Sequence, residues 1–149
     1  MPLTDSTETI ANYIYTKIKL PANMTSLGLS SVWYGDQELL PVTPAVCVSP
    51  GPKQREFQGA TFRTLNTIET YALVYYGKIQ DIQVNLHSAT TLADSIETLI
   101  HSDLTLGGNV IAVLCTQNEP GVINKAGVWV MGARLTFQST SKTTFPAQM

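Results

Sequence analysis

The hydrophobic positions near the N-terminus repeat with a helical period. Within residues 5–19, apolar side chains recur every four residues and form one stripe, made of Ile10, Ile14 and Ile18 with Ala11 beside them. Asp5 and Glu8 have the spacing of a capping box, and Pro21 is expected to end the helix because proline cannot donate to the helical ladder. The pattern therefore predicts an amphipathic helix over residues 5–19.

A second helical stripe covers residues 89–101, and Ser88 is in position to cap it. The apolar positions of this stripe are Ala89, Leu92, Ala93, Ile96, Leu99 and Ile100. Residues 79–87 fit two patterns, because their apolar positions alternate as in a strand and also extend the helical stripe backwards. Both readings stay open here. Gly107 and Gly108 follow the helix and predict a tight turn in which at least one of them has a positive φ.

Five segments have the composition of strands, with β-branched, aromatic and alternating apolar residues: 30–34, 45–48, 67–77, 109–116 and 127–138. Segment 109–116 is apolar on both faces, which favours a central strand. Segment 67–77 would extend about 35 Å and could project beyond a small domain. The breakers at residues 49–52 and 118–121 predict that the strands before them stop there.

The order of these segments is helix, strands, helix, strands. Strands that come in runs, rather than alternating with helices, predict an α+β fold with a mainly antiparallel sheet and helices packed on one face. The length of 149 residues suits a single domain. We place this domain at residues 1–138, followed by a polar C-terminal tail at 139–149.

The most polar stretch of the body is residues 51–60. It can be a solvated loop or an arm that projects towards a partner. If it is an arm, it and the tail 139–149 are expected to contact neighbouring subunits. The candidate contact residues are the charged Lys53, Arg55 and Glu56 and the apolar anchors Phe57 and Phe145.

The chain is poor in charge. Charged residues make up 13% of it, against about 25% in a typical domain, and the net charge is −2. Such a surface is poorly protected against association, so we expect partners to cover part of it. The near-neutral balance argues against a dedicated nucleic-acid binder. No apolar run is long enough to span a bilayer and no signal peptide is evident, which predicts assembly in a cytosol with Cys47 and Cys115 as buried thiols.

Candidate chemistry is sparse. His87 and His101 are the only histidines, and His101 could share a helix face with Asp94, but no nucleophile with a recognisable motif accompanies them. No cysteine or histidine cluster has the spacing of a metal site, and the glycine pair lacks the lysine of a phosphate loop. The sequence therefore predicts no enzyme, no cofactor and no metal.

Several segments resemble the tail terminator proteins of tailed phages. The passage IETLIHSDLTLGGNV at residues 96–110 is similar to their helix–turn–strand passage, AVCVSPG at 45–51 to their second strand, and WYG at 33–35 to the hairpin before it. The closing GARLTF at 132–137 is similar to their last strand. The likeness spans roughly residues 5–138 and rests on structural turns rather than on chemical signatures.

The resemblance implies a structural virion protein with a sheet flanked by helices. Six copies would form a ring at the head-proximal end of the tail tube, end tube polymerisation and present a surface to the head connector. Genomic DNA would pass through the lumen without sequence reading, and neither a membrane nor a cofactor would be involved. A closed ring needs two different patches on each subunit, which agrees with the charge-poor surface.

Three alternatives remain at this stage. The first is another neck component, such as a tail-completion or head–tail adaptor protein. The second is a small enzyme that uses Asp94 and His101. The third is a cytosolic binding module that uses residues 51–60, and a monomer with a deep polar pocket would favour the last two.

Overall fold

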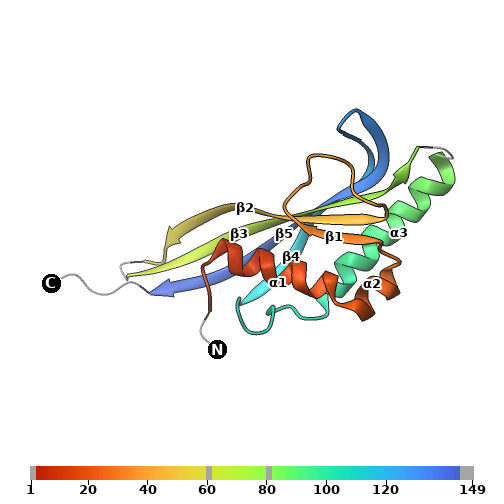
Figure 1. Ribbon diagram of the computed structural model, residues 1–149. Coiled ribbons are helices and arrows are strands. Elements are labelled where there is room, and N and C mark those ends of the chain that lie inside the picture. The colour runs from red at the N-terminus through yellow and green to blue at the C-terminus, as the bar shows by residue number, and fades with distance from the viewer. Residues whose placement is uncertain (1–2, 60–61, 80–81, 145–149) are drawn as a thin grey trace.

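A computed structural model describes residues 3–59, 62–79 and 82–144, and in these ranges three helices lie against one face of a five-stranded sheet (Figure 1). The elements in chain order are α1 (Thr7–Lys19), α2 (Pro21–Leu27), β1 (Ser31–Tyr34), β2 (Ala45–Phe57), β3 (Arg63–Lys78), α3 (Ile82–His101), β4 (Ala112–Lys125) and β5 (Val128–Thr144). The strand order is β1-β2-β3-β5-β4; β1 runs parallel to β2, and every other pair is antiparallel. The predicted α+β class is confirmed.

The first helix forms where the apolar stripe places it, but its cap differs from the prediction. Ser6 caps α1, and its Oγ accepts a hydrogen bond of 3.2 Å from the Thr9 amide. Asp5 is therefore not the capping residue; it lies one position further out, where its carboxylate meets Arg55 instead. Pro21 does end α1, and it also begins α2, because a proline in the first turn gives up only an N–H that has no helical partner.

The ambiguous segment before the second stripe is helical from Ile82 onwards. Ser88 consequently lies inside α3 and does not cap it, which corrects the prediction. A helix pairs its own backbone groups, whereas a strand at this place would need a neighbour. The segment has no such neighbour in the described sheet. Strand β3, which precedes it, ends at Lys78 and is already paired with β2 on one side and with β5 on the other.

Strand β2 does not stop at Ser49–Pro52 as the breakers predict. It continues to Phe57 across an irregularity between Pro50 and Lys53, and it stays paired with β3 on both sides of that point. The pairing of β1 with β2 ends at Val48, so the prolines lie where β2 is an edge strand among the described residues. A proline at an edge breaks no inter-strand hydrogen bond, which explains why the strand passes through. Residues 51–57 thus belong to β2 rather than to a loop.

The position of β4 also differs from the prediction. The run 109–116 was expected at the centre of the sheet, but β4 pairs with β5 alone and forms an edge of the described sheet. The apolar side chains on the outer side of this run are exposed to solvent, as Ile111 and Leu114 show. As in β2, the edge position lets β4 continue through Pro120 to Lys125. Strand β5 is also longer than predicted, because it continues past the expected domain boundary at residue 138 and ends at Thr144.

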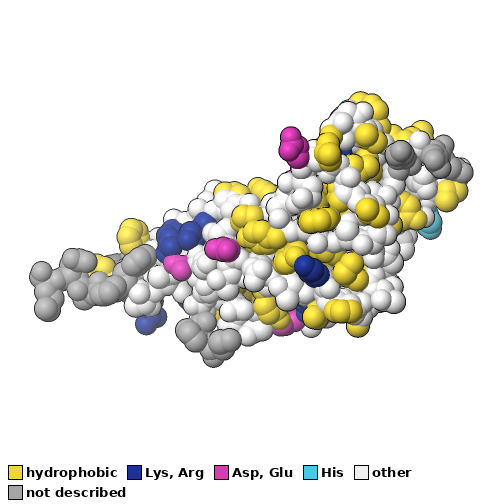
Figure 2. Space-filling model, viewed as in Figure 1, with side chains coloured by type: hydrophobic (Ala, Val, Ile, Leu, Met, Phe, Trp, Pro, Cys, Tyr) yellow, Lys and Arg dark blue, Asp and Glu magenta, His cyan; other side chains and the backbone are white. Residues whose placement is uncertain are grey.

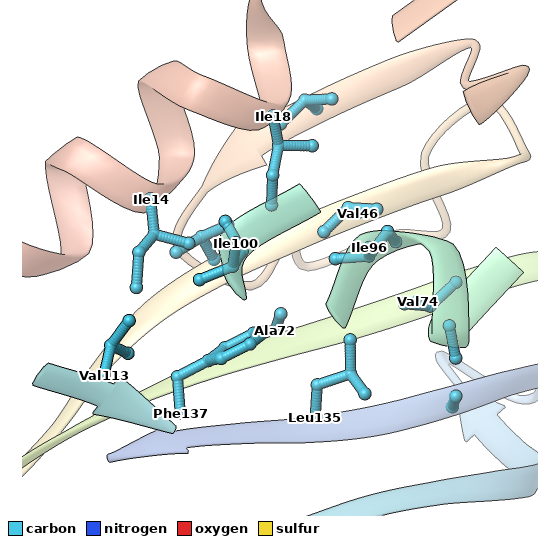
Figure 3. Close-up of a cluster of buried hydrophobic side chains, with 14 of the residues drawn as sticks. Ile14, Ile18, Val46, Ala72, Val74, Ile96, Ile100, Val113, Leu135 and Phe137 are labelled. Atoms are coloured by element: carbon cyan, nitrogen blue, oxygen red, sulfur yellow. The ribbon is translucent and has the colours of Figure 1, made fainter. Parts of the chain in front are cut away.

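The main core lies between the sheet and the helices (Figure 3). Side chains from α1 and α3 point down onto the sheet, and those of the four longer strands point up between them; labelled members are Ile14, Ile18, Val46, Ala72, Val74, Ile96, Ile100, Val113, Leu135 and Phe137. All of these are less than 2% exposed. Burying a side chain of this size contributes about 1.5–3 kcal/mol, so this layer supplies most of the driving force for folding.

The two ends of the sheet differ. At one end, parts of β2, β3 and β5 extend beyond the helices; we call residues 53–58, 62–66 and 139–144 the arm (Figure 1). At the other end, the loop of residues 35–44 and the curled tips of β4 and β5 lie near a small second core made of Cys47, Tyr75, Ile123 and Val130.

Candidate assembly surfaces

The two histidines lie in different surroundings. His87 is exposed on α3, whereas His101 is half-buried, with its Nε2 accepting a 2.9 Å hydrogen bond from the Cys115 amide and its ring meeting Phe137 edge to face. The Asp94 carboxylate, which sequence spacing placed near His101, instead accepts a 3.0 Å hydrogen bond from Asn118 Nδ2. His101 thus satisfies a backbone group of β4, which is a structural role.

The thiols are also placed as structural groups. Cys47 is fully buried and Cys115 half-buried, and both are free. Burial raises the pKa of each thiol to about 11, which keeps them protonated and poorly nucleophilic. Within the described ranges no three residues among His, Cys, Asp and Glu lie close enough to hold a metal ion. No helix in those ranges has the length and hydropathy to cross a membrane.

The arm is held against the start of α1 by Asp5. The Asp5 carboxylate accepts hydrogen bonds from Arg55 Nη2 at 2.6 Å and from Thr143 Oγ1 at 3.1 Å, and its carbonyl accepts one from Lys53 Nζ at 2.9 Å. The hydrogen bond from Arg55 is the main cause that lowers the pKa of Asp5. One residue thereby joins both outer strands of the arm, β2 and β5, to the helical layer; we call this set of contacts the Asp5 clamp.

The structure separates the predicted contact residues by role. Lys53 and Arg55 belong to the Asp5 clamp and are occupied within the chain. Glu56 is exposed on the opposite face of β2, next to Leu65 of β3. Phe57 is 70% exposed at the end of β2, and Phe62, which sequence reasoning missed, is 50% exposed where the chain returns. Phe145 lies outside the described residues.

Inside the arm, β3 and β5 are joined by polar side chains. Asn66 is fully buried; its Nδ2 donates to Thr143 Oγ1 at 2.7 Å and to Ser141 Oγ at 3.3 Å, and its Oδ1 accepts from Thr64 at 3.0 Å. Ser141 is fully buried as well. Because a buried amide is costly unless its hydrogen bonds are made, this network holds β3 and β5 in one register.

The glycine turn has the predicted backbone. Gly107 and Gly108 have φ values of 71° and 86°. Asp103, which the sequence reading left aside, organises the turn, because its Oδ2 accepts hydrogen bonds of 2.8 Å from the Gly107 amide and from the Tyr13 hydroxyl. The hydrogen bond from Tyr13 is the main cause that lowers the pKa of Asp103. The turn therefore connects α3 with α1 before the chain enters β4.

At the other end, a polar group fixes the loop of residues 35–44. The Asp36 carboxylate accepts hydrogen bonds of 2.8 Å from Lys125 Nζ and from the Tyr75 hydroxyl, and the Lys125 ammonium lies 5.7 Å from the centre of the Tyr75 ring. Burial alone would raise the pKa of Asp36, but these hydrogen bonds outweigh it and lower the pKa. The loop is thus attached to the tip of β4.

Beside this loop lies an apolar groove of about 320 Å³, which we call the Trp33 groove. It is lined by Trp33, Gln37, Glu38, Leu39, Leu40 and Pro41. Trp33 and Leu39 are 42% and 72% exposed. Figure 2 shows hydrophobic side chains gathered over this end of the molecule, while Lys and Arg side chains gather on the arm. Residue spacing had given no sign of this groove, since its members come from β1 and from the loop that follows.

Comparison with known proteins identifies the fold. No protein family and no curated protein matches this sequence. In structure, however, a solved chain matches: a component of the "Virion of native gene transfer agent (GTA) particle" has the same fold. The two superpose with a TM-score of 0.62 over 94% of this chain and 100% of the other, at 14% sequence identity. The likeness thus extends over almost the whole of both chains, arm and helical layer together.

Proposed function

We propose that this chain is a structural virion protein that forms a ring at the head-proximal end of a phage-like tail tube. The observation that carries the proposal is the end-to-end likeness to a component of a gene transfer agent virion. The helix–turn–strand passage at residues 96–110, on which the resemblance to tail terminators rests, supports it. In the structure this passage runs from α3 through the Asp103 turn towards β4.

The shape of the molecule suits a repeating assembly. A subunit with an extended arm at one end and an exposed apolar groove elsewhere offers two different patches, as a heterologous contact requires. Repeated around an axis, such contacts close a ring, and we take six copies as the expected number. The ring would end tube polymerisation on one side and receive the head connector on the other, with DNA passing through its lumen.

The placement of the reactive groups supports a role without catalysis. The histidines and thiols are exposed singly or used in packing, as described above. Three other grooves of the described surface, of about 430–470 Å³, are lined mainly by uncharged side chains. We therefore propose that neither a cofactor nor a substrate is involved.

Purified protein imaged in negative stain, alone and with preformed tail tubes of the same virion, tests this function. We expect rings of about six subunits and one capped end per tube, and capped tubes should no longer elongate when tube protein is added. A protein that stays monomeric at high concentration and leaves the tube ends bare would contradict the proposal. Binding to the head connector, but not to the tube, would favour the adaptor alternative.

A further inference from the structure

We propose that the tip of the arm of one subunit docks in the Trp33 groove of a second copy of this chain. The inference rests on the proposed ring and names its subunit contact. It assigns Phe57 and Phe62 as the inserted side chains and Glu38 as the acidic group that faces the basic arm.

The arm has the properties of an inserted element. Phe57 and Phe62 are 70% and 50% exposed, and buried aromatic anchors dominate the binding energy of protein interfaces. The arm is also basic, because it contains four cationic side chains (Lys53, Arg55, Arg63 and Lys142) and a single acidic one, Glu56. Lys53 and Arg55 are bound to Asp5 within the chain, which leaves Arg63 and Lys142 to meet the partner. The Asp5 clamp aligns it before binding, which lowers the entropy that docking would otherwise cost.

The groove has complementary properties. Its wall is formed by Trp33, Leu39, Leu40 and Pro41, and its volume of about 320 Å³ accommodates an aromatic side chain. The loop of residues 35–44 contains two acidic residues, Asp36 and Glu38, and no basic one. Asp36 is paired with Lys125 within the chain, which leaves Glu38 to meet the incoming arm. The contacts of Asp36 also fix the loop, so the groove exists before binding.

A second copy is the occupant that this pairing selects. The arm points away from the helical layer and from the loop of its own chain, so it does not reach its own groove (Figure 1). The apolar tip therefore matches the apolar groove of another molecule rather than that of its own chain. The basic arm matches the acidic loop of that molecule in the same way. Charge complementarity of this kind guides the partners into register, while the aromatic side chains supply the affinity.

Disulfide trapping tests the contact. The double variant Phe57→Cys, Leu39→Cys is oxidised gently and analysed on a non-reducing gel. We expect a ladder of covalent oligomers up to the full ring, because each subunit would link to the next. Each single variant should give no ladder. The matched control Phe57→Cys, Leu104→Cys places the second thiol at a leucine that is 52% exposed in the turn after α3, and it should give none either.

The outcomes separate this inference from the proposed function. Rings formed by the Phe57→Cys, Leu39→Cys variant itself, without a ladder after oxidation, would overturn the docking contact and leave the ring standing. Monomers in every variant and in the wild type would contradict both. A ladder of equal extent in the Leu104 control would show unspecific contact and overturn the inference.

A charge variant gives an independent readout. Glu38→Lys should weaken subunit association about tenfold, since like charges would then meet across the interface. The control is Glu119→Lys, because Glu119 is an exposed acidic residue on β4 outside the groove. This variant should leave the dissociation constant unchanged. An unchanged dissociation constant for Glu38→Lys would overturn the role given to Glu38.

Discussion

At the scale of single residues, Gly107 is a position where backbone and packing both require glycine. Its φ is 71°, and a Cβ there would lie 3.0 Å from the ring of Tyr13, the residue that the Asp103 turn binds. We expect Gly107→Val to lower the free energy of unfolding by more than about 1 kcal/mol. Gly77→Val is the control, because Gly77 has no positive φ and a Cβ there meets nothing within 4 Å. Urea unfolding of both variants measures the difference, and equal midpoints would contradict the prediction.

Asp36 makes stability depend on pH. Its pKa is lowered in the folded chain, so its contribution is fully present above the ordinary pKa of an aspartate and is lost as pH falls through the folded value. Asp36→Asn should therefore destabilise the protein at pH 7 by about 1 kcal/mol, a value reduced for the partial exposure of the side chain.

The gap between the two proteins should narrow as pH falls below about 4, where the wild-type carboxylate becomes protonated. Urea midpoints of both proteins from pH 7 to pH 3 measure it. Glu38→Gln is the control, since Glu38 is exposed on the same loop, and it should not change the midpoint at pH 7. A constant gap across this range would mean that the ionised form of Asp36 does not contribute.

At the scale of elements, the arm is attached to the body by the Asp5 clamp. Asp5→Ala removes the acceptor shared by Arg55 and Thr143, and we expect the arm to open more often. Amide hydrogen exchange should rise by about tenfold in residues 53–57 and 139–144 and stay unchanged in β3 from Ala72 to Tyr75, whose side chains belong to the two cores. Glu8→Ala, in the first turn of α1, is the matched control. Unchanged exchange in the arm would show that strand pairing alone holds it.

A truncation at the C-terminal end would affect the fold of the arm as well as its contacts. Removing residues 140–149 would delete the end of β5, including buried Ser141 and the Thr143 that contacts both Asn66 and Asp5. Such a variant loses a strand of the arm, so a loss of assembly would not separate contact from folding. Substitutions at the arm tip are therefore the cleaner test.

At the scale of the whole molecule, the arm should be needed for assembly and dispensable for the helical core. A Gly-Ser link in place of residues 53–58 removes Phe57 and the end of β2, whereas the main core lies elsewhere on the sheet. We expect a folded subunit by circular dichroism that sediments as a monomer at concentrations where the wild type forms rings. Rings of wild-type size from this variant would contradict a contact role for the arm.

The periodic pattern of the chain determined the elements that are amphipathic by themselves. The four-residue repeat of isoleucines in α1, the stripe of α3 and the alternation in β5 each predict an element, and each element forms there. The ends of two of them differ, because α3 begins at Ile82 and β5 continues to Thr144. The glycine turn was predictable for a similar reason, since a positive φ is a local property of the backbone. The α+β class followed from the order of these elements.

Tertiary structure alone decided which strands are edges and how far they run. The breakers at Pro50 and Pro120 would end a central strand, but both lie on edges, where no neighbour needs the missing N–H. Likewise, the apolar run at residues 109–116, most of which lies in β4, gave no sign that one of its sides faces solvent. The candidate site shows the same limit: sequence singled out Phe57, while Asp5 and the Trp33 groove depend on contacts between residues far apart in the chain. The local sequence pattern shows which face of a segment is apolar and must be buried. Only the assembled sheet determines which neighbouring element covers that face.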